Sequence, residues 1–134
     1  IVTKADDTTI QSLDDLIGKT VSVNLGYTAD TFLSERPGII INRIPSALIS
    51  QAILELQSKR SDAFVASKSS VAPYFNQYGT KYLRMIPLQV AQEIYAFAVS
   101  LHHPELKEQI EQALPSMHQD GTLTHLKKTW NLHD

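Results

Sequence analysis

The sequence predicts an α/β domain in which helices flank a mostly parallel central sheet. Three observations lead to this prediction. Short runs with strand character alternate with segments whose apolar residues recur every three or four positions. Glycine or proline stands at many of the boundaries between them. The chain has 134 residues and is 43% hydrophobic, which is enough apolar material for one folded core.

Composition and charge exclude several functional classes. The 12 basic and 14 acidic residues give a formal net charge of −2 without a basic run, so the electrostatic footprint of a nucleic-acid binder is missing. No stretch reaches the roughly 20 apolar residues of a membrane span, and no signal-peptide pattern is present. A chain without cysteine forms no disulfides and no thiolate metal sites, and the five histidines lack metal-ligand spacing. We therefore expect no metal and no other cofactor.

The chain is predicted to begin with an extended lead-in over residues 1–9. A short helix over residues 13–17 follows, because Ser12 can cap it, the acidic Asp15 stands three positions later, and Gly18 stops it.

The stretch around Gly26 organises the rest of the chain. Valines alternate with polar residues over residues 20–25, which predicts a strand with one buried face. Gly26 ends this strand, and Thr28 stands at the N-cap of a helix over residues 29–36. The first N–H groups of a helix lack intrahelical partners and carry the positive end of its dipole, so a carboxylate or phosphate can bind there. Asp30 supplies negative charge to the same groups and competes with an outside anion.

The remaining elements follow from the same signals. Strands are predicted over residues 39–44, 61–66, 82–87 and 93–100. Helices are predicted over about residues 46–58, and over 67–77, 104–119 and 123–130. Pro73 limits the second of these helices to a first turn or a kink.

Two groups of residues are expected to meet at one edge of the sheet. In a parallel sheet, ligands bind outside the C-terminal ends of the strands. Gly26, Tyr27 and Thr28 follow one predicted strand, and Ser67 and Lys68 follow another. Loops from separate strands that meet in this way are typical of a small-molecule cleft.

Four stretches of the chain resemble the motifs of one protein family. They are residues 12–28, with the pattern Ser-x-x-Asp-Leu-x-Gly-Lys-x-Val before a glycine turn, residues 58–65, with an Arg-x-Asp-Ala run, and residues 93–99 and 118–130. In this order they resemble the second lobe and closing helix of amino-acid-type solute-binding proteins, family 3, of bacterial ABC transporters. Similar patterns occur in ionotropic glutamate receptor ligand cores and in sensor-kinase input domains.

The resemblance implies a type II periplasmic-binding-protein-like lobe with hinge strands over residues 1–100. It implies that residues 101–134 form a helical tail that packs on a first lobe, which this sequence does not contain. The implied function is binding of a small polar solute, an amino acid or a related carboxylate, in a cleft between two lobes, as the substrate-binding component of a transporter. The implied location is periplasmic or otherwise extracytoplasmic, with a membrane permease or a receptor as partner.

The resemblance also implies roles for single residues. Gly26, Tyr27 and Thr28 give backbone N–H groups and the Thr28 hydroxyl to a ligand carboxylate. Tyr27 departs from the small residue usual in the family and narrows the cleft. The acid that usually pairs with the α-ammonium of the ligand is replaced by Ser67, which is followed by Lys68.

Three functions remain open, namely a transporter's solute-binding protein, the ligand-binding domain of a receptor or sensor, and a lobe that serves as an interaction module. No enzyme is expected. Some cyclic-acid dehydratases are similar to this family, but the chain shows no supporting acid pair and no nucleophile–base–acid pattern. Asp62 is expected to be structural, with its carboxylate on local amides at a strand start. The apolar stripes of residues 101–134 predict docking on a first lobe, a second chain or another copy of this chain.

Overall fold

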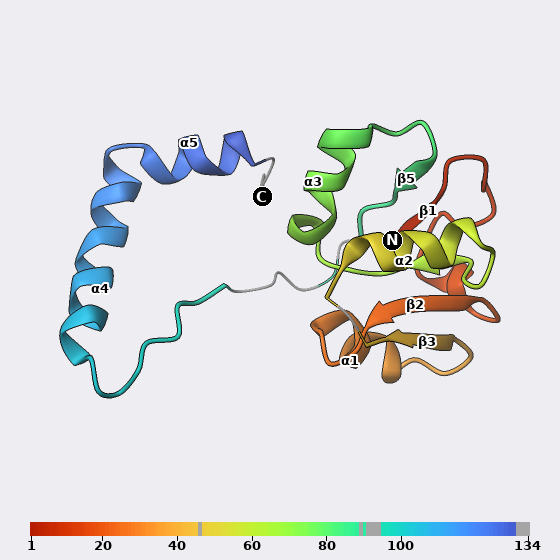
Figure 1. Cartoon of the computed structure of the whole chain (residues 1–134), viewed down its shortest axis with the longest axis horizontal. Coiled ribbons are helices and arrows are strands. Elements are labelled where there is room, and N and C mark those ends of the chain that lie inside the picture. Colours follow the sequence, from red (N-terminus) through yellow and green to blue (C-terminus); the bar gives the residue numbers. More distant parts are fainter. Residues whose placement is uncertain (46, 89, 91–94, 131–134) are drawn as a thin grey trace. The chain divides into compact units, whose positions relative to one another are not determined.

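The computed structural model describes residues 1–45, 47–88, 90 and 95–130 of the chain (Figure 1). The chain divides into two compact units, residues 1–90 and residues 91–134, and each unit is described by itself.

Along the chain the elements follow in the order β1-η1-β2-α1-β3-α2-β4-α3-β5-α4-α5. The strands of the first unit are β1 (Val2–Lys4), β2 (Thr20–Asn24), β3 (Ile40–Ile44), β4 (Ala63–Phe64) and β5 (Leu83–Met85). Its helices are the 3-10 turn η1 (Asp14–Leu16), α1 (Thr28–Ser34), α2 (Ile49–Gln57) and α3 (Lys68–Tyr78). The second unit contains α4 (Pro104–Gln119) and α5 (Thr122–Thr129).

The five strands form one sheet with the order β3-β2-β4-β1-β5 (Figure 1). β2 runs parallel to β3 and to β4. β1 runs antiparallel to both of its neighbours, β4 and β5. Every strand except β1 therefore points the same way, and the predicted mostly parallel α/β sheet is confirmed.

The sheet separates two apolar clusters. On one face, Val21 and Val23 of β2 pack with Leu33 of α1, and all three side chains are buried. On the other face, Phe64 of β4 packs with Leu56 of α2, and residues of α3 complete this cluster. Successive side chains of a strand point to opposite faces, so neighbouring residues of the sheet contribute to different clusters. Helices consequently cover both faces of the sheet.

One prediction for the first unit is wrong in detail, and another is incomplete. β2 is predicted to bury one face, but its polar residues Ser22 and Asn24 are as buried as its valines, because α2 contacts the strand on that face. The predicted lead-in contains β1, an inner strand in which Val2 lies opposite both Phe64 and Met85. The lead-in is extended as predicted, and it is a full member of the sheet.

The turn η1 forms where a short helix is predicted. The backbone N–H and the hydroxyl of Ser12 both donate to the carboxylate of Asp15, each at 2.8 Å. The hydrogen bond from the N–H of Gln11, together with those from Ser12, holds the pKa of the Asp15 carboxyl below its usual range. Ser12 and Asp15 are therefore paired, but the prediction that Ser12 caps the helix is wrong, because Leu13 is the N-cap and the Ser12 hydroxyl donates to Asp15 instead of accepting a helical N–H.

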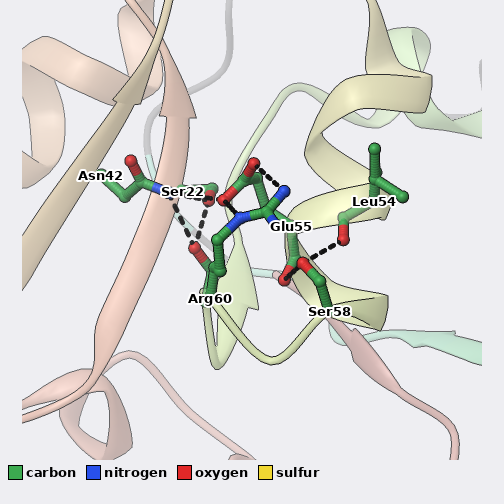
Figure 2. Close-up of polar contacts among 7 residues, drawn as sticks. Ser22, Asn42, Leu54, Glu55, Ser58 and Arg60 are labelled. Atoms are coloured by element: carbon green, nitrogen blue, oxygen red, sulfur yellow. Dashed lines mark hydrogen bonds and ion pairs between the residues drawn. The ribbon is translucent and has the colours of Figure 1, made fainter.

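The end of α2 is closed by local hydrogen bonds. The hydroxyl of Ser58 donates to the carbonyl oxygen of Leu54 at 2.7 Å (Figure 2). Lys59 then adopts a φ of 58°, the left-handed conformation in which helices commonly end. This reversal lets the N–H of Arg60 donate to the carbonyl oxygen of Glu55 at 3.0 Å. The chain thus turns back along α2 before it enters β4.

Proline does not end α3. Pro73 lies inside this helix, which has 11 residues. The predicted limit of a first turn is therefore wrong, and the helix continues through the proline.

The second unit confirms both predicted helices, with α5 beginning and ending one residue earlier than predicted, and it contradicts one predicted strand. α4 has the predicted bounds, because Pro104 fits its first position and Gly121 stops the chain after the C-cap. Residues 95–100 of the strand predicted over 93–100 form no strand, whereas residues 93 and 94 lie outside the described residues. The apolar run has the right alternation, but no neighbouring strand of the described chain pairs with it.

The described residues of α4 and α5 bury no side chain fully. Leu106, Leu126 and Trp130 are 45%, 40% and 57% exposed. None of the described helices combines the length and the apolar character that crossing a membrane requires.

Candidate functional site

Two connections leave the sheet side by side at one edge. β2 and β4 are neighbouring parallel strands, with Ser22 opposite Phe64, so residues 25–28 and 65–68 follow them at the same edge. β5 points in the same direction, so residues 86–88 leave there as well. We call residues 25–28, 65–68 and 86–88 the C-terminal edge. It brings together both groups of predicted site residues.

Gly26 makes the turn after β2 possible. Its φ is 77°, in the left-handed region that residues with a side chain disfavour. Tyr27 follows in an extended conformation as the N-cap of α1, and Thr28 is the first helical residue. The prediction that Thr28 is the N-cap is therefore wrong by one position. The reason is that the N–H groups of Asp30 and Thr31 both donate to the carbonyl oxygen of Tyr27, which starts the helix there.

Asp30 neutralises the start of α1 from inside the fold. Its carboxylate accepts hydrogen bonds from the N–H of Gly26 at 3.0 Å, from Nε of Arg43 at 2.9 Å and from the hydroxyl of Ser34 at 3.3 Å. The hydrogen bond from Gly26, followed by the charge of Arg43, holds the pKa of the Asp30 carboxyl below its usual range. The Asp30 side chain is only 10% exposed. Asp30 thus binds the N–H of Gly26 in the turn before α1, whereas the prediction named the first N–H groups of the helix itself.

The turn still offers a ligand two side chains and one amide. The N–H groups of Gly26 and Tyr27 donate within the fold, so an outside carboxylate would have to share them. The N–H of Ala29 finds no acceptor among the described residues, which is usual in the first turn of a helix. The side chain of Tyr27 is 51% exposed, and that of Thr28 is exposed as well.

A group of serine hydroxyls lies at the second connection. Ser67 is the N-cap of α3 and is half-buried. Its Oγ lies 2.7 Å from Oγ of Ser70 and 3.2 Å from Oγ of Ser69. Lys68, the first residue of α3, is exposed. This connection can therefore donate or accept hydrogen bonds through hydroxyls, and it carries one positive charge.

Formal charge is scarce at the C-terminal edge. Lys68 is the only charged side chain of these three described connections. The backbone nitrogen of Ile1 also lies there and donates to the carbonyl oxygen of Ile86 at 2.8 Å. Among the described residues of the three connections, a ligand meets hydroxyls, an amide and one ammonium group, but no exposed carboxylate.

A second polar group lies on the sheet face that α2 covers. We call Ser22, Asn42, Glu55, Arg60 and Ser61 the α2 polar cluster (Figure 2). The hydroxyl oxygens of Ser22 and Ser61 are 2.5 Å apart, and both residues are buried. Nδ2 of Asn42 lies 3.1–3.2 Å from both hydroxyls and from Oε2 of Glu55. Arg60 donates to both Glu55 oxygens, at 2.8 and 2.9 Å, and these bonds lower the pKa of the Glu55 carboxyl.

The α2 polar cluster joins elements and leaves little for a ligand. It links β2, β3, α2 and the residues before β4, and its members bond mainly to one another. Near it, the carboxylate of Asp62 accepts a hydrogen bond from the N–H of Thr20, the first residue of β2, at 2.8 Å. Asp62 thus has a structural role, at the edge opposite the C-terminal edge, but the amide that it binds belongs to the neighbouring strand and is not a local one as predicted.

Metal binding finds no support in the described part of the chain. No three or more of its histidine, aspartate and glutamate side chains are grouped so as to hold a metal ion.

Comparison with known proteins finds that this chain is similar to part of several amino-acid-binding proteins. No protein-family model matches it. The chain is 31% identical, over 97% of its length and 50% of the relative's, to the probable amino-acid-binding protein YxeM of Bacillus subtilis. It is 30% identical, over 97% of its length and 51% of the relative's, to the arginine-binding extracellular protein ArtP of the same organism. The chain thus spans about half the length of the curated relatives it matches.

Several solved structures have the same fold as this chain. An ancestral arginine-binding protein bound to glutamine superposes with a TM-score of 0.80 and 32% identity, over 96% of this chain and 57% of that one. Domain 2 of the T. maritima ArgBP gives a TM-score of 0.56 and 29% identity, over 69% of this chain and 96% of the domain. The GluR0 ligand-binding core of Nostoc punctiforme, in complex with glutamate, superposes with a TM-score of 0.79 and 29% identity, over 96% of this chain and 58% of that one.

These relatives are named for binding amino acids and not for catalysis, and the match to a single domain covers nearly all of that domain. The chain is therefore a homologue, about half their length, of the family 3 amino-acid solute-binding proteins of ABC transporters, and it matches one lobe of their type II periplasmic-binding-protein fold.

Proposed function

We propose that this chain forms one lobe of a two-lobe cleft that binds an amino acid or a related carboxylate, as the substrate-binding component of an ABC transporter. The observation that carries the proposal is the C-terminal edge, where two connections with hydrogen-bonding side chains meet in a fold that superposes on an arginine-binding protein with a TM-score of 0.80. The extracellular relative ArtP supports an extracytoplasmic location.

The proposed mechanism is closure of a second lobe over the C-terminal edge. Tyr27, Thr28 and the N–H of Ala29 would meet the ligand from the first connection, and Ser67 and Lys68 from the second. Gly26 supplies the backbone turn that places them. Contacts that exist only in the closed state shift the equilibrium toward closure, because a ligand stabilises the conformation to which it binds better.

Substitution of Thr28 tests the site. Thr28→Val removes the hydroxyl but keeps the side-chain shape, and it is expected to weaken solute binding about three- to tenfold. The measurement is calorimetric titration of the complete protein that carries this lobe, with a panel of amino acids and related carboxylates. Thr31→Val removes an exposed hydroxyl from the same helix and is expected to leave the affinity unchanged. Equal effects of the two variants would remove Thr28 from the site.

We also propose that residues 101–134 form a tail that docks on a partner lobe or a second chain. Ile110, Leu114 and Leu123 are only half-buried, and Leu106 and Trp130 are exposed. Apolar groups in this number rarely remain in water on a monomer.

Sedimentation tests the docking of the tail. The 134-residue chain is expected to associate with itself as its concentration rises, and Trp130→Glu is expected to weaken that association. A single monomeric species at all concentrations, without any partner, would contradict this role.

A receptor or sensor domain is the second candidate function. The likeness to the GluR0 ligand-binding core, at 29% identity, favours it, because that protein uses the same fold. A permease and an ATPase encoded beside this chain would favour the transporter, and a membrane span in the same polypeptide would favour the receptor.

A further inference from the structure

The charge of the C-terminal edge narrows the class of solute. We infer that the solute presents to this lobe a carboxylate whose α-carbon carries a neutral hydroxyl or oxo group in place of an ammonium group. The inference rests on the proposed function, because it concerns the same cleft.

The one carboxylate near the first connection is not available to a cation. Asp30 already accepts hydrogen bonds from Gly26, Ser34 and Arg43, and its side chain is only 10% exposed. An ammonium group that approached this turn would have to displace the Arg43 guanidinium, which holds the carboxylate at 2.9 Å. The first connection therefore offers a cation only neutral acceptors.

The second connection disfavours a cation more strongly. Ser67 is neutral, and its hydroxyl lies within hydrogen-bonding distance of those of Ser69 and Ser70. The neighbouring charge is the exposed ammonium of Lys68, which repels a second cation. A closed cleft excludes water, so an ammonium group without a counter-charge would be costly there. A hydroxyl or oxo group can exchange hydrogen bonds with these serines without such a penalty, while Lys68 favours the carboxylate.

Matched pairs of solutes test the inference. The complete protein that carries this lobe is titrated calorimetrically with alanine and lactate, phenylalanine and phenyllactate, and glutamate and 2-hydroxyglutarate. In the pair that binds best, the hydroxy acid is expected to bind at least about tenfold more tightly than the amino acid. Ser67→Asp places a carboxylate at the second connection and is expected to shift this preference toward the amino acid by about ten- to a hundredfold. Aspartate is a favourable N-cap residue, so this variant keeps the start of α3.

A control separates local charge from net charge. Gln77→Glu adds the same charge to an exposed position of α3, about 15 Å along the helix from Ser67, and is expected to leave the preference unchanged. Wild-type protein that binds the amino acid of the best pair at least as tightly as the hydroxy acid would overturn the inference and leave the proposed function standing. So would an Ser67→Asp variant that gains nothing for the amino acid. No binding of either member of any pair, nor of any compound in the wider panel of amino acids and related carboxylates, would overturn the proposed function, and the inference with it.

Discussion

Replacing Phe64 with alanine is expected to lower the free energy of unfolding by about 3–5 kcal/mol. The Phe64 side chain is fully buried. It lies on β4 in the middle of the sheet, opposite Ser22 of β2 on one side and Val2 of β1 on the other. Both neighbouring strands are held by the sheet, so the space left by the ring cannot collapse easily, and the lost contacts add to the lost burial. Chemical denaturation followed by circular dichroism measures the change.

An exposed phenylalanine provides the control for this measurement. Phe97 is 69% exposed in the second unit. Phe97→Ala is expected to change the free energy of unfolding by less than about 0.5 kcal/mol. If Phe64→Ala destabilised the chain no more than this control, β4 could not be the centre of a packed sheet.

Asp30→Asn is expected to destabilise the chain by about 1–3 kcal/mol at neutral pH. Asparagine has nearly the same size, but it loses the charge that strengthens the hydrogen bonds from the Gly26 N–H and the Arg43 guanidinium. The side chain of Arg43 is 45% exposed, so water can solvate it once its partner is neutral. This exposure keeps the cost below that of breaking a fully buried ion pair.

The pH dependence of Asp30→Asn gives a second signature. Folding lowers the pKa of Asp30 below the value of about 3.9 that an unfolded chain shows. As the pH falls, the unfolded chain therefore binds the proton first, and the stabilisation by Asp30 is lost as the pH passes through the folded pKa. The difference between wild type and Asp30→Asn should be constant from about pH 6 to 8 and shrink below about pH 4.

Glu35→Gln is the matched control for the stability measurements at acidic pH, because Glu35 is an exposed acid directly after α1. This variant is expected to stay within about 0.5 kcal/mol of wild type at each pH. A difference between wild type and Asp30→Asn that persisted unchanged into strong acid would show that Asp30 contributes no charge-dependent stability.

The elements that local signals define are predictable from the sequence. α4 has a proline at its first position and an Asp-Gly pair after its last turn, and its predicted bounds agree with the structure. β1 has only three residues, and its partners Phe64 and Met85 come much later in the chain. Residues 95–100 show the reverse case, since they alternate like a strand but have no strand to pair with in the described chain. Whether β1 and residues 95–100 form strands depends on pairing with distant parts of the chain, and the local sequence does not show which segments will pair.

In the candidate site, too, features set by neighbouring residues are predictable, whereas features that depend on strand pairing are not. The glycine turn and the competing carboxylate of Asp30 lie within a few residues of each other, so the sequence predicts both. Arg43 is missed because it reaches Asp30 only through the parallel pairing of β2 with β3. The α2 polar cluster is missed for the same reason, although polar residues such as Ser22 and Asn42 in otherwise apolar strands are a signal that something polar must face them.

The α2 polar cluster has a consequence for how accurately this chain folds. A slip of β2 or β3 by one residue would turn Ser22 or Asn42 to the opposite face, among valines and leucines. Each buried hydroxyl or amide left without a partner would cost about 1–3 kcal/mol, and Glu55 and Arg60 would lose their neighbours on the sheet. The cluster therefore favours the native register of β2 and β3, because only that register gives its buried polar groups their partners.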